Sequence, residues 1–265
     1  MEVFWLKSAS FFLIFITGLT GGFFAHWLSK RSNSKIIFSL GNAFAGGVFL
    51  GAGLIHMLPD AQSGFAAISS NSDYPWFAVI CIAGFLTIFF LERVLLHHSH
   101  DSVPETDNIA VNNNPSRILY PYVLMFILSI HSIIAGIALG IEEKAIQAIV
   151  ILLAVLAHKG TAAFALGVSM LRNNTDKKKY RSMITFFSFM TPLGIMLGYL
   201  FSVLLSGSSE QIFEAIFDAL AAGTFIYVAV MDILDEEFTI REKLITKFSF
   251  VLVGLAIMAV VAIWT

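Results

Sequence analysis

The sequence predicts an all-α, multi-pass protein of the cell membrane with eight transmembrane helices, and three observations predict it. The chain of 265 residues is 57% hydrophobic and 13% charged, with a mean hydropathy of +0.82, which is too apolar for a water-soluble domain of this size. Eight separate segments are close to the roughly 20 apolar residues that a helix needs to cross the hydrocarbon core. Basic residues gather in alternate loops. We therefore expect one integral-membrane domain over residues 1–265.

The expected spans are the apolar runs between polar connections. In chain order they cover residues 8–28, 36–58, 75–96, 118–140, 145–171, 183–205, 212–234 and 247–264. The first is a retained helix and not a cleaved signal peptide, because the basic pair Lys30-Arg31 follows the apolar run. Pro59 is expected to end the second span. The four-residue turn 141–144 makes the fourth and fifth spans antiparallel neighbours.

The basic residues predict the orientation of the bundle. The loops after spans one, three, five and seven and the helix ends beside them hold 13 basic residues: Lys30, Arg31, Lys35, Arg93, Arg117, Arg172, Lys177, Lys178, Lys179, Arg181, Arg241, Lys243 and Lys247. The opposite side holds two, Lys7 and Lys144. By the positive-inside rule the first set lies in the cytoplasm. Both termini are therefore expected to be extracellular.

Composition and connections exclude several classes of function. The single cysteine, Cys81, leaves no disulfide framework and no cysteine-based zinc site. The formal net charge of -2 gives no reason to expect a nucleic-acid partner. The longest connection, the cytoplasmic loop 97–117, begins with the histidine-rich stretch HHSHD. Two interpretations of this loop stay open, weak metal binding and a solvated connection.

Two histidines, His131 and His158, fall near the middles of the fourth and fifth spans. Since these spans are antiparallel neighbours, the two imidazoles can meet at similar depth. Neutral imidazole is the commonest metal ligand, whereas a lone histidine in a membrane is more often a packing residue. Two at matching depth favour a metal site, because ionisable groups in hydrocarbon are costly.

Other polar groups lie within or at the ends of spans. His56 and Asp60 are four residues apart and share a helix face, which suits either a metal ligand pair or a helix-end salt bridge. Glu92 and Asp232 lie in the inner halves of their spans and need a partner or water. The acidic run 235–237 follows at the inner mouth, where Asp235 and Glu236 are expected to form a solvated helix end.

Lys159 places an ammonium group beside His158 near the midplane. It is either a tether to a carboxylate from another helix or a resident cation in the place of a second metal ion. A retinal-binding lysine is disfavoured, because small residues that suit close helix packing surround it.

Five sets of motifs occur in chain order. They are GGVFL (46–50) with HMLPD (56–60), HS (131–132) with GIALG (136–140), HK (158–159) with FALG (164–167), TPLGI (191–195), and AGTFIY (222–227) with DIL (232–234). Together with eight spans and outward termini, they resemble the ZIP (Zrt/Irt-like) divalent-metal transporters over the whole chain.

The resemblance implies transport of a divalent metal ion into the cytoplasm, with no catalytic cofactor and no enzymatic activity. His131, Ser132 and His158 then correspond to the midplane metal ligands. His56 with Asp60 resembles the entrance, and Asp232 with Glu237 the exit. The resemblance also implies that helices one, four, five and six move against the others in an elevator-like manner, and that the protein often forms a homodimer. Zinc, iron(II) and manganese all suit histidine and oxygen ligands, with cadmium as an adventitious substrate.

The chain departs from the family pattern at two positions. Relatives usually carry Glu four residues after the histidine of the fourth or fifth span, and here these positions are Ala135 and Ala162. Two imidazoles and a hydroxyl leave a divalent charge uncompensated, so a carboxylate from elsewhere is required or binding is weak. The candidate carboxylates are Asp60, Glu92, Asp218 and Asp232. The lysine after the second histidine resembles the branch of the family with one metal site.

Two alternatives to a transporter stay open. A transport-incompetent relative that acts as a sensor or subunit is consistent with the missing carboxylates. A membrane-embedded metal hydrolase would use His131 and His158, but it needs a third protein ligand and a general base. No compact motif in the sequence supplies them.

Overall fold

The computed structural model describes residues 2–31, 34–68, 74–95, 115–204 and 209–263, which form helices and no strand. The histidines at 97, 98 and 100 lie outside the described residues. The α-helices are α1 (Glu2–Leu28), α2 (Ser34–Gly51), α3 (Leu58–Ile68), α4 (Trp76–Phe89), α5 (Pro115–Ile141), α6 (Ala145–Arg172), α7 (Lys177–Leu204), α8 (Ser209–Tyr227), α9 (Asp235–Thr239) and α10 (Leu244–Val261).

In the described part of the chain, three short π-helical segments interrupt this order: Ala52–Met57 between α2 and α3, Phe90–Leu95 after α4, and Val228–Leu234 between α8 and α9.

Among the residues that the structure describes, eight continuous helices are long and apolar enough to cross a membrane, as predicted. They are Val3–Leu28, Lys35–Ala67, Trp76–Val94, Pro121–Ile141, Ala145–Arg172, Lys177–Ser202, Ala215–Thr239 and Leu244–Val261. Large apolar side chains cover their outer surface; Trp5 is 68% exposed and Ile245 85% exposed. Such a surface suits contact with lipid.

The expectation that Pro59 ends the second span is wrong. A proline inside an α-helix clashes with the carbonyl four residues before it and donates no hydrogen bond. Here the π-helical segment ends at Met57, two residues before Pro59, and the N–H of Leu58 bonds to the carbonyl of Gly53, five residues back. The wider turn accommodates the proline. The helix therefore continues through α3 to Ile68.

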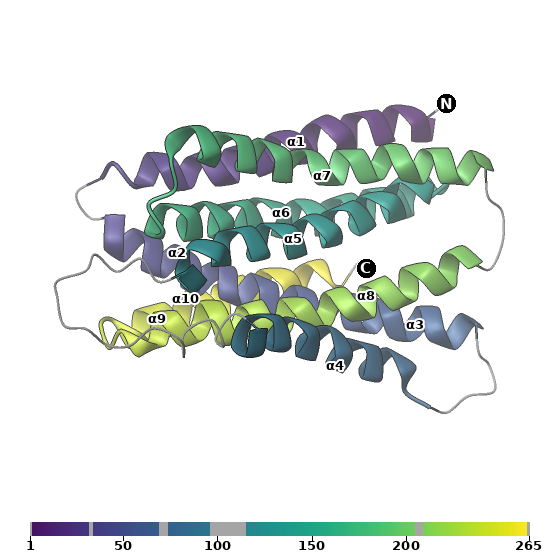
Figure 1. Cartoon of the computed structure of the whole chain (residues 1–265). Coiled ribbons are helices and arrows are strands. Elements are labelled where there is room, and N and C mark those ends of the chain that lie inside the picture. The colour runs from purple at the N-terminus through teal and green to yellow at the C-terminus, as the bar shows by residue number, and fades with distance from the viewer. Residues whose placement is uncertain (1, 32–33, 69–73, 96–114, 205–208, 264–265) are drawn as a thin grey trace.

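The helices form two groups (Figure 1). The first group contains α1, α5, α6 and α7, and the second contains α2, α3, α4, α8, α9 and α10. Contacts between helices are far more numerous within each group than between the groups.

Glycines permit close packing inside each group. A side chain at Gly136 of α5 would overlap the carbonyl of Thr191 in α7, and one at Gly223 of α8 would overlap the carbonyl of Cys81 in α4. These helices therefore touch through their backbones, which is the usual role of small residues between membrane helices.

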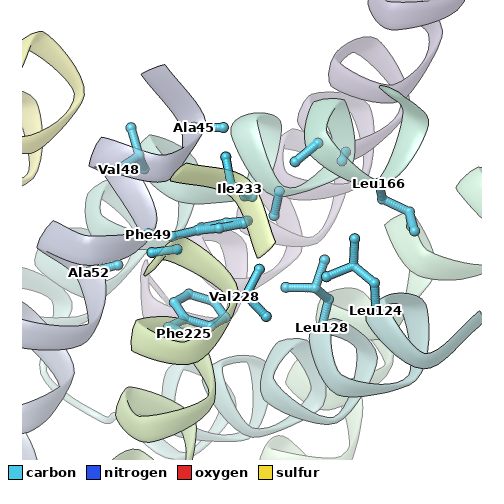
Figure 2. Close-up of a cluster of buried hydrophobic side chains, with 14 of the residues drawn as sticks. Ala45, Val48, Phe49, Ala52, Leu124, Leu128, Leu166, Phe225, Val228 and Ile233 are labelled. Carbon is cyan, nitrogen blue, oxygen red and sulfur yellow. The ribbon is translucent and has the colours of Figure 1, made fainter. Parts of the chain in front are cut away.

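The hydrophobic core lies where the two groups meet (Figure 2). Phe49 of α2, with Phe225 and Val228 from the region around the end of α8, approaches Leu128 of α5 and Leu166 of α6. All five side chains are almost completely buried. The contact between the groups at this level is thus made by apolar side chains.

Candidate functional site

His131 of α5 and His158 of α6 lie next to each other in the core. The two Nε2 atoms are 3.5 Å apart, and the side chains are 6% and 4% exposed. The short connection between α5 and α6 makes these helices neighbours, which is why residues 27 positions apart meet.

The distance between the imidazoles suits one shared metal ion. A zinc ion with two Zn–N bonds of about 2.0–2.1 Å at the tetrahedral angle holds the two nitrogens about 3.3–3.4 Å apart. The observed 3.5 Å between the Nε2 atoms is close to this value. This separation of the two nitrogens is compatible with one zinc ion between them and equally with a direct contact between the imidazoles.

Lys159 lies beside this pair and is almost completely buried, at 2% exposure. Its ammonium donates hydrogen bonds to Ser132 Oγ at 2.9 Å and to the carbonyl oxygen of Phe187 at 3.0 Å. It also lies 3.7 Å from the centroid of the Phe187 ring, a cation–π contact. Among the contacts that the structure describes for Lys159, its partners are thus a hydroxyl, a carbonyl and an aromatic face.

Phe225 of α8 covers the imidazole pair from the second group. Its ring centroid lies 4.4 Å from that of His131 and 6.2 Å from that of His158. It also packs against Phe49 at 5.0 Å. Sequence reasoning did not select Phe225 as a functional residue, although it stands within one of the quoted motifs.

The two positions that lack the usual carboxylate, Ala135 and Ala162, have apolar surroundings in the fold. Ala162 is buried in the main hydrophobic cluster, and Ala135 is partly buried and packs against a second cluster that includes Ile14 and Leu139. Across the described part of the chain, His, Cys, Asp and Glu side chains form no group of three that is able to hold a metal ion. The imidazole pair is therefore a two-nitrogen site with a nearby hydroxyl.

Each of the three π-helical segments contains one predicted polar residue: His56, Glu92 or Asp232. A π turn inserts an extra residue into an α-helix and is frequent at functional sites. The insertion redirects the side chains around it relative to the α-helical pattern. Sequence periodicity does not reveal these turns.

His56 and Asp60 form the pair that their spacing predicts. His56 Nδ1 lies 2.9 Å from Asp60 Oδ2. The histidine side chain is 14% exposed and the carboxylate 41% exposed, so the pair opens toward the surface. It lies in the interior of the second span, and not at a helix end.

Glu92 and Asp232 lie together, although 140 residues separate them in the chain. Their carboxyl groups are within side-chain hydrogen-bonding reach, and Tyr227 also contacts Glu92. Asp232 is only 9% exposed. The guanidinium of Arg93 interacts electrostatically with both carboxyl groups and offsets the repulsion between them. Asp218, the other candidate carboxylate, lies partly buried on α8.

Glu237 is the most enclosed carboxylate among the candidates, at 1% exposure. Ser39 Oγ donates to its Oε2 at 2.6 Å, and Asn42 Nδ2 donates to its Oε1 at 3.0 Å. The guanidinium of Arg172 also donates to Oε1. Both carboxylate oxygens are therefore engaged in this conformation.

Glu236 is 58% exposed, which agrees with the expected solvated helix end, and its carboxylate also pairs with Arg172 at 3.0 Å. Arg172 was not selected from the sequence, since a basic residue at a helix end usually contacts solvent or lipid headgroups. These groups line a pocket of about 410 Å³ near the end of α6.

The chain matches one family of known proteins along most of its length. Residues 4–118 and 112–262 match the family described as ZIP zinc transporter. The zinc transporter ZIP2 of Mus musculus is 30% identical over 273 residues, with 86% of each chain covered. The human ZIP2 is 29% identical over 89% of this chain and 88% of its own. The zinc transporter ZIP1 of Bos taurus is 30% identical over 87% of this chain and 79% of its own.

Proposed function

This chain belongs to the ZIP zinc transporter family, and from that premise we propose that it carries divalent metal ions, zinc foremost, across the membrane into the cytoplasm. Members of this family are transporters and not enzymes. The observation that carries the proposal is the buried imidazole pair, whose 3.5 Å separation suits one zinc ion.

In this proposal His131 and His158 bind the ion through their Nε2 atoms, and Ser132 supplies an oxygen. Ser132 Oγ accepts a hydrogen bond from Lys159, so the ammonium shares or releases this oxygen when the ion arrives. The site takes one ion, because Lys159 supplies a resident positive charge where a second ion would otherwise sit.

The remaining polar residues form the two ends of a path. His56 and Asp60 bind the ion on the side expected to be extracellular, where their side chains are partly exposed. Glu92 and Asp232 receive the ion next, and the buried Glu237 follows near the basic end of the bundle, where the loops rich in Lys and Arg lie. Carboxylate and imidazole suit zinc, iron(II) and manganese alike, so this ligand set does not select one ion by chemistry alone.

Movement between the two helix groups supplies alternating access. Backbone contacts at Gly136 and Gly223 hold helices closely together within each group, whereas apolar side chains meet between the groups. The imidazole pair belongs entirely to the first group, and Phe225 of the second group covers it. A shift of the first group relative to Phe225 uncovers the pair on one side.

A metal sensor that binds zinc without transport is the second candidate. It is favoured by one observation, the absence of a third His, Cys, Asp or Glu ligand beside the imidazole pair in the described part of the chain. The two candidates predict the same binding site, and they differ in whether the bound ion crosses the membrane.

The test is zinc uptake by cells that express His131→Ala, His158→Ala or the wild type, combined with zinc binding to each purified protein. His26→Ala is the matched control, since His26 is a partly buried histidine on α1 beside Tyr180 and away from the pair. We expect each site variant to lose saturable uptake and binding while its surface expression matches that of the control.

Three results would contradict this proposal. Normal uptake by both site variants makes the histidines packing residues. Binding without uptake in the wild type identifies a sensor. A loss in His26→Ala equal to that in the site variants makes the effect a general one of histidine removal.

A further inference from the structure

The two helix groups meet differently at the level of the core and at the end near Arg172. At the core level the contacts are apolar, and the tip of the Phe164 ring of α6 lies against Gly41 of α2. Near the end of α6 a polar cluster joins the groups. The first kind of contact permits sliding, because the ends of side chains rearrange more easily than two backbones in contact.

Most buried polar contacts stay inside one group. Those within the first group are made by Lys7 to the carbonyl of Gly140, Lys159 to Ser132, and Tyr180 to the carbonyl of Gly22. Those within the second group are made by Ser39 and Asn42 to Glu237, and by Lys247 to the carbonyls of Glu237 and Ile240. These contacts move with their own group when the groups separate.

Arg172, in contrast, makes polar contacts that connect the two groups. It is the last residue of α6, in the first group, while its partners Glu236 and Glu237 belong to α9, in the second. One guanidinium nitrogen lies 3.0 Å from Glu236 Oε1, and the other donates to Glu237 Oε1. We call these two contacts the Arg172 bridge.

Glu237, one partner of Arg172 in the bridge, is held in place by several hydrogen bonds. Glu237 is fixed by Ser39 and Asn42, and the Lys247 ammonium binds the backbone carbonyl of the same residue. The side chain of Arg172 is 28% exposed. A charge-assisted, two-armed contact between partly buried groups is stronger than an exposed surface ion pair.

We propose that the Arg172 bridge closes the basic end of the path between the two helix groups, and that it must break each time this end opens. The proposal rests on the proposed function for its purpose, since a transporter has to close and open this end in every cycle. It makes Arg172 a positioning residue that does not bind the transported ion.

The bridge also determines when Glu237 is free to bind an ion. Asn42 and Arg172 share Oε1, and Ser39 occupies Oε2. A divalent cation and the guanidinium compete for the same oxygen, because both need its negative charge. Glu237 therefore accepts an outgoing ion only after Arg172 has moved away with the first group.

The first test measures opening without any metal. Ser169 is 8% exposed and lies three residues before Arg172, on the same face of α6. Ser169→Cys is nearly isosteric and introduces a thiol behind the bridge, and Cys81→Ala removes the one native thiol. The rate at which a charged methanethiosulfonate reagent modifies Cys at 169 in purified, metal-free protein reports access to the basic end.

Arg172→Gln breaks both arms of the bridge, and Glu236→Gln breaks the exposed arm. Arg181→Gln is the matched control, since Arg181 is an exposed basic residue on the adjacent helix α7. We expect the thiol to be modified about tenfold faster in Arg172→Gln than in the control, at an intermediate rate in Glu236→Gln, and at the parent rate in the control. The reason is that the closed state becomes less populated when it loses a contact that the open state does not make.

Equal modification rates in Glu236→Gln, Arg172→Gln and Arg181→Gln would overturn the proposal. If Arg172→Gln does not fold, Glu236→Gln decides alone, because its side chain is 58% exposed and its replacement leaves the buried contacts of Glu237 in place. A rate in Glu236→Gln equal to that of the control then overturns the proposal as well.

The second test separates this proposal from the proposed function. In zinc uptake at saturating zinc, Arg172→Gln is expected to be slower than Arg181→Gln, because the closed state forms less often. Absence of uptake in the parent contradicts transport, whereas the modification rates, which need no metal, still decide whether the Arg172 bridge closes this end.

Discussion

At the scale of single residues, the charges around His131 and His158 determine how firmly an ion is held. The pair has one hydroxyl and one ammonium beside it, and Ala135 and Ala162 contribute no charge. A divalent ion meets an uncompensated positive charge from Lys159 in a poorly hydrated site, where Coulomb repulsion is weakly screened. We therefore expect weak binding and easy release at this site.

A carboxylate at position 135 is predicted to tighten binding. Ala135 is one helical turn beyond His131 on the same face and is only partly buried, so a longer side chain has room to reach the ion. The zinc dissociation constant of Ala135→Glu is expected to fall about tenfold, which corresponds to roughly 1.4 kcal/mol. Turnover should slow, because a more tightly held ion leaves more slowly.

Titration calorimetry of purified Ala135→Glu and the wild type measures this change. Ala135→Gln is the matched control, because it has nearly the same shape without the charge. Equal affinities for Glu and Gln would show that residue 135 does not face the ion, or that another carboxylate already completes the site.

The same scale shows where sequence reasoning succeeds. The proximity of His131 and His158 followed from the short turn between two spans, because a short connection leaves little freedom in how the helices pair. Phe225 and Arg172 were missed for the opposite reason. Their partners are at least 64 positions away in the chain, and only the docking of the two helix groups brings them together.

At the scale of helices, the number and approximate bounds of the spans followed from apolar run length, whereas the interior of the helices did not. Pro59 was interpreted as a helix end, but a π turn accommodates it. Such a turn depends on local packing and leaves no periodic signal in the sequence. The same holds for the π turns at Glu92 and Asp232, which redirect two candidate carboxylates.

Glycine contacts within a group give a prediction at this scale. Gly136→Ala places a methyl group against the carbonyl of Thr191 and pushes α5 away from α7, whereas a Cβ atom at Gly160 would lie 3.3 Å from the methyl group of Thr17 and 3.9 Å from its carbonyl oxygen. Overpacking of this kind costs about 1–3 kcal/mol. Thermal unfolding in detergent is expected to show a clearly lower midpoint for Gly136→Ala than for Gly160→Ala. Similar midpoints would mean that α5 and α7 are not closely packed.

At the scale of the whole molecule, the charges in the loops predict the orientation in the membrane, whereas helix packing determines the division into two groups. The distribution of basic residues predicts which ends of the helices face the cytoplasm, because lipid and insertion machinery act on each loop separately. It does not predict the division into two groups, which depends on which glycine faces which backbone. The Arg172 bridge lies at the basic end, so the orientation decides whether it closes the path toward the cytoplasm.

The orientation itself is the last prediction, and two introduced cysteines test it from opposite sides. Asn113 lies in the connection expected to be cytoplasmic, and Lys144 is an exposed residue in the turn between α5 and α6, at the other end of the helices. In intact cells an impermeant thiol reagent is expected to label Lys144→Cys and not Asn113→Cys, and permeabilisation should expose the second. The native Cys81 is 7% exposed and should give little background. Because 13 basic residues against two determine the expected orientation, labelling of Asn113→Cys in intact cells would place both termini in the cytoplasm and reverse the proposed direction of the path.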